Sequence, residues 1–201
     1  MFSSVLQRLN DRRDAAGDAG EDAGFTLIEL MVVLLILAIL LAIAIPTFLG
    51  VTKSANDRAT QSNLNTALVN SKAAFQQAGQ TYTTLNTATL SSAEPSLSYT
   101  TGTSGAQSTI SLFTSADGNG VVLVGWSKSN QCWGIADNSQ AITTSPISAT
   151  TYTNATAAGS VPIAPGEWYG KLAAGAGVTT ANCGAGTALT NMVWQQNSFA
   201  P

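Results

Sequence analysis

The longest apolar stretch of the chain runs from Phe25 to Val51, and no polar side chain occurs between Leu30 and Ile45. A helix that crosses a bilayer needs about 20 apolar residues. The stretch is therefore long enough to span a membrane as one helix. A glycine, Gly24, stands directly before it, and a carboxylate, Glu29, falls on its second turn.

Beyond Gly50 the pattern changes to a single apolar stripe with three- and four-residue steps, which is typical of a helix with one buried face. The predicted stripe consists of Phe48, Val51, Ala55, Ala59, Leu64, Ala67, Leu68, Ser71, Phe75 and Ala78. Gly79 follows as a candidate C-cap. We predict one helix from about Phe25 to about Ala78, with a kink at Pro46 and Gly50, because proline lacks the hydrogen-bond donor of a helical turn.

Alternating apolar positions then predict an antiparallel meander of three strands, Ser108–Phe113, Val121–Trp126 and Gln131–Ala136. Turn residues separate them at Asp117–Gly120 and Ser127–Asn130. One face of this sheet should cover the helix stripe. The fold class is therefore predicted as α+β, a long N-terminal helix packed on a small antiparallel sheet.

The remaining segments show no such periodicity. Residues 80–105 are predicted as a loop, with anchors at Tyr82, Leu85, Leu90, Leu97 and Tyr99. Thr143–Thr156 is predicted as an exposed loop, Gly166–Gly177 as irregular chain pinned by Trp168 and Tyr169, and Leu189–Gln195 as a last short strand. We expect the tryptophans (Trp126, Trp133, Trp168 and Trp194) in the core rather than on a sugar-binding platform, which stays the alternative.

Composition narrows the function. The chain has 8 Lys and Arg, 11 Asp and Glu, and no His. The basic residues are dispersed and do not form the positive patch that binds nucleic acid. The absence of His removes the commonest acid–base group and metal ligand. The turn at Asp117–Gly120 supplies too few carboxylates for a calcium loop, which needs six to eight oxygens. We expect no enzyme activity, no cofactor, no metal and no nucleic-acid partner.

The segment Ala23–Leu30, AGFTLIEL, resembles the processing site of type IV prepilins. The resemblance implies that a membrane peptidase cuts between Gly24 and Phe25 and methylates the new amine of Phe25. It also implies that Glu29 partners the N-terminal amine of a neighbouring subunit during assembly. Basic residues before the helix favour a cytoplasmic N-terminus, although the acidic run Asp18–Asp22 departs from the usual basic leader.

The resemblance implies four parts: a cytoplasmic leader (1–24) that is removed, a transmembrane and filament-core helix (25–51), an amphipathic helix (52–79) and a globular β-sheet head (80–201). The subunit would sit in the cell membrane and then in an extracellular filament. Its expected partners are other pilin subunits, the prepilin peptidase and methyltransferase, and the assembly platform in the membrane.

Two alternatives remain open, a pseudopilin of a type II secretion system and an adhesive or DNA-uptake minor pilin. If the head is exported, Cys132 and Cys183 should form one disulfide, which would bound a C-terminal loop region. Two unpaired buried thiols are the other interpretation.

Overall fold

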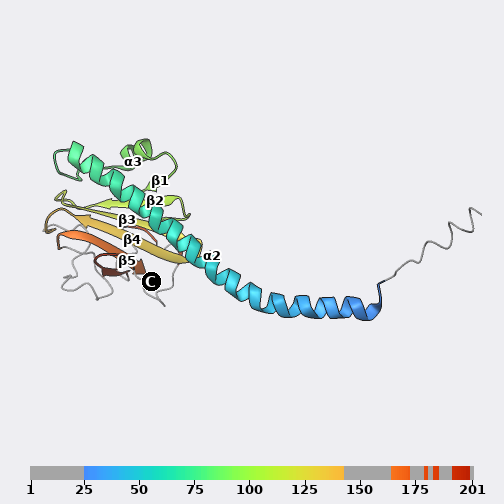
Figure 1. The fold of residues 1–201 in the computed structure, drawn as a ribbon. Coiled ribbons are helices and arrows are strands. Elements are labelled where there is room, and N and C mark those ends of the chain that lie inside the picture. Colours follow the sequence, from blue (N-terminus) through green and yellow to red (C-terminus); the bar gives the residue numbers. More distant parts are fainter. Residues whose placement is uncertain (1–24, 143–163, 173–178, 181–182, 186–191, 200–201) are drawn as a thin grey trace, which may run out of the picture. The chain divides into compact units, whose positions relative to one another are not determined.

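The structure is a computed structural model that describes residues 25–142, 164–172, 179–180, 183–185 and 192–199. Its elements in chain order are α2 (Leu27–Gln77), α3 (Thr87–Ala93), β1 (Ser98–Thr100), β2 (Thr109–Thr114), β3 (Gly120–Ser127), β4 (Gln131–Asn138), β5 (Gly166–Leu172) and β6 (Met192–Gln195). The chain divides into two compact units, Met1–Phe48 and Leu49–Pro201. The predicted α+β class is confirmed: a long N-terminal helix packs on a mostly antiparallel sheet (Figure 1).

Helix α2 ends where the sequence places its cap. Gly79 has a positive φ of 76°, and the Gln80 amide donates to the Phe75 carbonyl at 2.9 Å. This bond, from the second residue past the cap back over the last turn, is the mark of a Schellman motif. Gly79 is suited to it because a residue without Cβ adopts positive φ at little cost.

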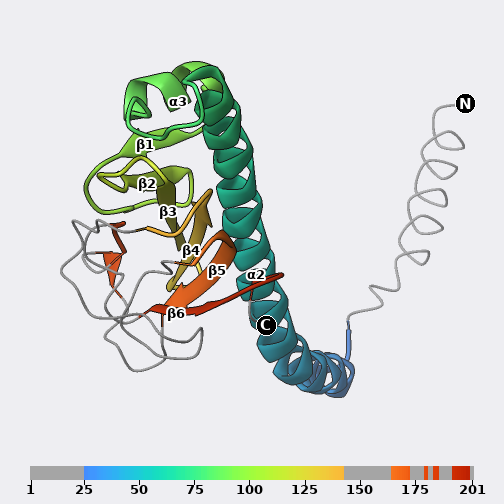
Figure 2. The same cartoon turned by 90° about the vertical axis from the view of Figure 1, so that its left-hand side faces the viewer.

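The six described strands form one sheet in the chain order β1-β2-β3-β4-β5-β6 (Figure 2). Among these described strands only β1 and β2 pair in parallel, and the other neighbours pair antiparallel. The predicted meander is confirmed as β2, β3 and β4, with turns at the predicted positions. Every residue of β3 is buried, so the middle of the sheet is covered on both faces.

One face of the sheet carries the second half of α2. The helix contributes Leu64, Ala67, Leu68 and Phe75, and the strands contribute Ile110, Leu112, Val121, Leu123, Trp133 and Ile135. The anchors predicted in the loop after α2, from Tyr82 to Leu97, join the same cluster, with Tyr99 partly buried against it. Burial of these side chains, at about 25 cal/mol per Å², is the main force that holds α2 on the sheet.

The predicted helix stripe is wrong in its first four positions. Phe48, Val51, Ala55 and Ala59 are exposed, and burial begins at Thr60. The register with the sheet explains the change. Thr60 packs beside Gly125, where a Cβ would lie 3.1 Å from the threonine methyl, and it is the first fully buried side chain of α2.

Two predictions of irregular chain are also wrong. Gly166–Leu172 is strand β5, which pairs with β4 over six residues from Gly166↔Asn138 to Lys171↔Trp133. The predicted loop 80–105 contains α3 and β1. Asn86 caps α3 by accepting from the Ala88 and Thr89 amides, each at 3.0 Å. The last predicted strand is confirmed over Met192–Gln195 as β6, while its first residues, 189–191, and the predicted loop Thr143–Thr156 lie outside the described residues.

Candidate functional site

The start of α2 is the first candidate site. Thr26 precedes the helix, and its hydroxyl accepts from the Glu29 amide at 3.2 Å while lying 3.3 Å from the Glu29 carboxylate. This is half of a capping box, in which a Thr and the Glu three residues later satisfy the free amides of the first turn. The ring of Phe25 is 83% exposed. Glu29 therefore has a local partner in the single chain.

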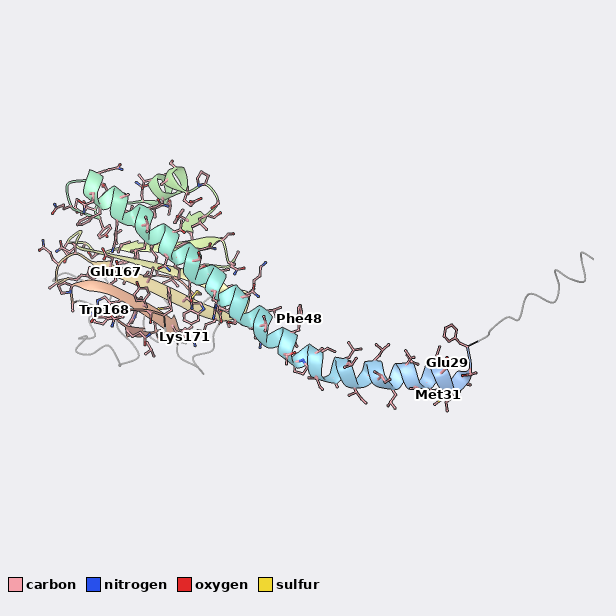
Figure 3. The ribbon with its side chains drawn as sticks, viewed as in Figure 1. Glu29, Met31, Phe48, Glu167, Trp168 and Lys171 are labelled. Carbon is pink, nitrogen blue, oxygen red and sulfur yellow. A yellow bond between two sulfur atoms is a disulfide. The ribbon has the colours of Figure 1, made fainter. Side chains whose placement is uncertain are left out.

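The apolar part of α2 has no cover among the described residues. Exposed large apolar side chains surround the helix axis and include Leu27, Ile28, Leu30, Met31, Leu34, Leu35, Ile39, Leu41, Ile43 and Phe48 (Figure 3). Helix α2 contains a segment long and apolar enough to cross a membrane, and none of that segment is buried. A continuous exposed apolar surface of this size marks a membrane or protein contact.

Pro46 lies inside α2, and the helix continues through Pro46 and Gly50 in the single chain. Proline cannot donate to the carbonyl four residues before it. The hydroxyl of Thr47, the next residue, bonds the carbonyls of Ala44 at 2.9 Å and Ile43 at 3.2 Å. Side-chain bonds of this kind compete with the backbone ladder and often bend helices. Gly50 has open space around it.

In the comparisons with known proteins, residues 21–45 match the family described as the prokaryotic N-terminal methylation motif. The matched segment contains Gly24, Phe25 and Glu29. No curated protein and no solved structure matches the chain significantly. The chain therefore has the N-terminal motif of type IV pilins and prepilins, followed by a long apolar helix and a disulfide-bonded α+β head.

A charged cluster between α2 and the head was not predicted from the sequence. Lys72 of α2 pairs with Asp137 of β4 at 3.2 Å and with Glu167 of β5. The hydroxyl of Tyr82 donates to Asp137 at 2.6 Å, and that of Tyr169 donates to Glu167 at 2.9 Å. These five residues, here called the Lys72 cluster, connect the helix, the loop after it and two strands. No local pattern signals them, because the partners are 65 and 95 residues from Lys72 in the chain.

Electrostatics in the Lys72 cluster favour its charged pairs. Burial opposes the charge of Lys72, but the hydrogen bonds and charges of Glu167 and Asp137 outweigh it and raise the lysine pKa. The hydrogen bond from Lys72 lowers the pKa of Glu167 against the opposing effect of burial. Burial, followed by the bond to Asp137, raises the pKa of Tyr82. In the cluster, the Lys72 ammonium binds the carboxylates of both Asp137 and Glu167. These contacts join α2 to the sheet.

The tryptophans are core residues, as predicted. Trp126, Trp133, Trp168 and Trp194 are all less than 10% exposed. The Trp133 indole donates to Asp57 of α2 at 3.0 Å, and Phe199 packs edge-on against Trp133 with ring centroids 5.7 Å apart. Rings held in this way present no platform to a sugar.

The expected disulfide is present. Cys132 of β4 and Cys183 are bonded, with Cα atoms 5.6 Å apart and 51 residues of sequence separation. The segment Cys183–Ala185 is also held by hydrogen bonds: the Ser104 amide donates to the Cys183 carbonyl at 2.6 Å, and the Ala185 amide donates to the Ser111 hydroxyl at 2.8 Å. Within the described ranges, no group of three His, Cys, Asp or Glu side chains could hold a metal ion.

Proposed function

We propose that this chain is a structural pilin subunit that is inserted in the membrane, processed, and assembled into a type IV pilus. The observation that carries the proposal is the methylation motif at 21–45 on a helix whose apolar side chains are exposed all round. A soluble monomer rarely exposes such a surface. Lipid before assembly and other subunits after it would supply the missing cover.

The proposed parts follow the motif. Residues 1–24 form a cytoplasmic leader that a prepilin peptidase removes after Gly24, and the new amine of Phe25 is methylated. Residues 25–51 anchor the subunit and then pack in the filament core, while residues 52–79 continue into the head, 80–201. The partners are other pilin subunits, the processing enzyme and a membrane assembly platform. The subunit itself catalyses no reaction.

Glu29 is the proposed assembly residue. A charged carboxylate near the centre of a bilayer costs roughly 2.5–3.5 kcal/mol on insertion scales. Near the membrane edge the Glu29 side chain lessens this cost by reaching water. A packed filament core contains no water for the carboxylate to reach. Cleavage at Gly24 places a cation, the amine of Phe25, four residues from Glu29. Staggered neighbouring helices can then bring one subunit's amine level with the next subunit's carboxylate.

The bond between Thr26 and Glu29 supports a competing, intrachain role as a helix cap, worth about 1 kcal/mol. Two variants separate the roles. Glu29→Val removes the carboxylate, and Thr26→Ala removes the capping hydroxyl while leaving the charge. The assembly role predicts processed subunit from both variants, with few or no filaments from Glu29→Val and near-normal filaments from Thr26→Ala.

Filaments are counted by electron microscopy beside an immunoblot for processed subunit. Abundant filaments from Glu29→Val would show that Glu29 is not needed for assembly. An equal loss of filaments in both variants would show that Glu29 acts as a helix cap. The intact mass of the subunit tests the pilin proposal itself. A mature chain that starts at methylated Phe25 is expected, and a mass that includes residues 1–24 would refute it.

A further inference from the structure

The turn between β2 and β3 contains an Asn119–Gly120 bond, next to Asp117–Gly118. An asparagine side chain followed by glycine is open to attack by its own backbone, because glycine has no Cβ to shield the peptide nitrogen. The nitrogen of Gly120 is then the nucleophile and the side-chain amide carbon of Asn119 the electrophile. The reaction needs no enzyme, cofactor or metal.

In the folded protein, the Gly120 nitrogen is already engaged in a hydrogen bond. The Gly120 N–H donates to the hydroxyl of Ser115 at 2.8 Å, and that hydroxyl donates in turn to the Asp117 carboxylate at 2.6 Å. Ser115 is 7% exposed. Attack requires Gly120 to lose its proton and turn toward Asn119, and both steps break the bond to Ser115.

The neighbouring groups hold the same peptide from its other side. The Asn119 carbonyl accepts from the Ser139 amide at 2.8 Å and from the Ser139 hydroxyl at 3.0 Å. Gly120 also starts β3 opposite Asn138. Rotation of the Asn119–Gly120 peptide therefore needs the end of the hairpin to open. The Ser115 hydroxyl is the side-chain group that binds the attacking nitrogen directly.

We propose that Asn119 is a site of spontaneous deamidation, and that Ser115 sets its rate by holding the Gly120 nitrogen. In the reaction the Gly120 nitrogen loses its proton and forms a bond to the Asn119 side-chain carbon, and ammonia leaves. The resulting cyclic imide takes up one water and opens at either carbonyl, which yields aspartate or isoaspartate. No electrons are exchanged. Either product adds one negative charge beside Asp117, and isoaspartate also lengthens the main chain.

The product would disturb the attachment of the turn to the loop after α2. The Gly118 carbonyl accepts from the Tyr82 amide at 2.8 Å, and a Cβ at Gly118 would lie 2.1 Å from the Thr81 hydroxyl oxygen. A turn this close to its neighbour does not take a longer main chain without moving. Tyr82 belongs to the Lys72 cluster, so the change reaches the contact between helix and sheet.

The test compares Ser115→Ala with Ser127→Ala in the full chain. Ser127 is a matched control, because it is also buried and its hydroxyl accepts from the Ser129 amide at 3.2 Å in the other hairpin turn. Folded protein is incubated at mildly alkaline pH, and deamidation of the Asn119 peptide is followed by mass spectrometry. We expect Ser115→Ala to react about tenfold faster than Ser127→Ala, which corresponds to about 1.4 kcal/mol in barrier. Equal rates would overturn the role of Ser115.

A second measurement does not depend on how the variant folds. Wild-type protein is compared in the folded state and in denaturant at the same pH. Slow deamidation of Asn119 when folded and fast deamidation when denatured would support the proposal. Equal rates in the two states, or no product at Asn119 in either, would overturn it.

Discussion

The indole of Trp194 lies directly over Gly170, its partner across the β5–β6 pair, so closely that a Cβ at Gly170 would be 2.9 Å from the ring. Met192 fills the same space, with its sulfur 2.6 Å from that Cβ position. Gly134, opposite Gly170 on β4, has the same two neighbours. Two glycines side by side thus leave room for one tryptophan and one methionine, which close the second face of the sheet.

This contact predicts that Gly170→Ala destabilises the head by about 1–3 kcal/mol, the usual cost of overpacking a core. The measurement is the free energy of unfolding of the purified chain in detergent by denaturant titration. Gly105→Ala is the control, because no atom lies within 4 Å of its Cβ position. Equal stability of the two variants would contradict the packing described.

Reduction of the Cys132–Cys183 disulfide should lower stability by about 4 kcal/mol, because the bond closes a loop of about 50 residues in the unfolded chain. The double variant Cys132→Ser/Cys183→Ser tests this against the oxidised wild type in urea. Alkylation of unreduced, denatured protein is the control for pairing. Two readily labelled thiols would refute the disulfide.

The Lys72 cluster predicts loss of stability in acid. The folded pKa of Glu167 is lowered, so its contribution is present above the unfolded value of about 4.3 and is lost as the pH falls through the folded value. The variant Lys72→Met removes the cation, and its stability should depend less on pH below about 4.5. If the stability of the variant and of the wild type changed equally with pH in this range, Lys72 would not lower the pKa of Glu167, and the prediction would be wrong.

The same cluster should weaken at strongly alkaline pH. The folded pKa values of Lys72 and Tyr82 are raised. Their contribution is therefore complete below the unfolded values of about 10, and it is lost as the pH rises through the folded values. Tyr82→Phe removes the donor to Asp137 and should flatten the alkaline limb of a thermal unfolding series. If the variant lost stability at alkaline pH as steeply as the wild type does, the loss would come from other groups.

If the chain assembles as proposed, we expect a local change of the helix at Pro46 and Gly50. In the single chain α2 is continuous there, although Pro46 supplies no donor and the Thr47 hydroxyl bonds the carbonyls of Ile43 and Ala44. A proline in a helix interior costs about 3 kcal/mol, so this stretch is the easiest part of the helix to open. We expect residues 44–50 to lose regular hydrogen bonding in a filament. A filament map with a straight, unbroken helix there would contradict this.

Features that depend on neighbouring residues could be predicted from the sequence alone. The apolar run, the Gly79 cap, the hairpin turn at Asp117–Gly120 and the methylation motif are all local patterns, because capping, turn chemistry and hydrophobic periodicity act within a few residues. The core positions of the tryptophans follow in the same way from their size and apolar character. These features were enough to predict the fold class and the N-terminal site.

Features that depend on residues far apart in the chain could not be predicted from the sequence and emerge only in the folded structure. Strand β5 has two glycines and mixed side chains, and it becomes a strand through pairing with β4 on one side and β6 on the other. The start of burial at Thr60 depends on where Gly125 meets the helix, and the Lys72 cluster joins three segments far apart in the chain. Such contacts are set by packing and register across the sheet, which no sequence window contains.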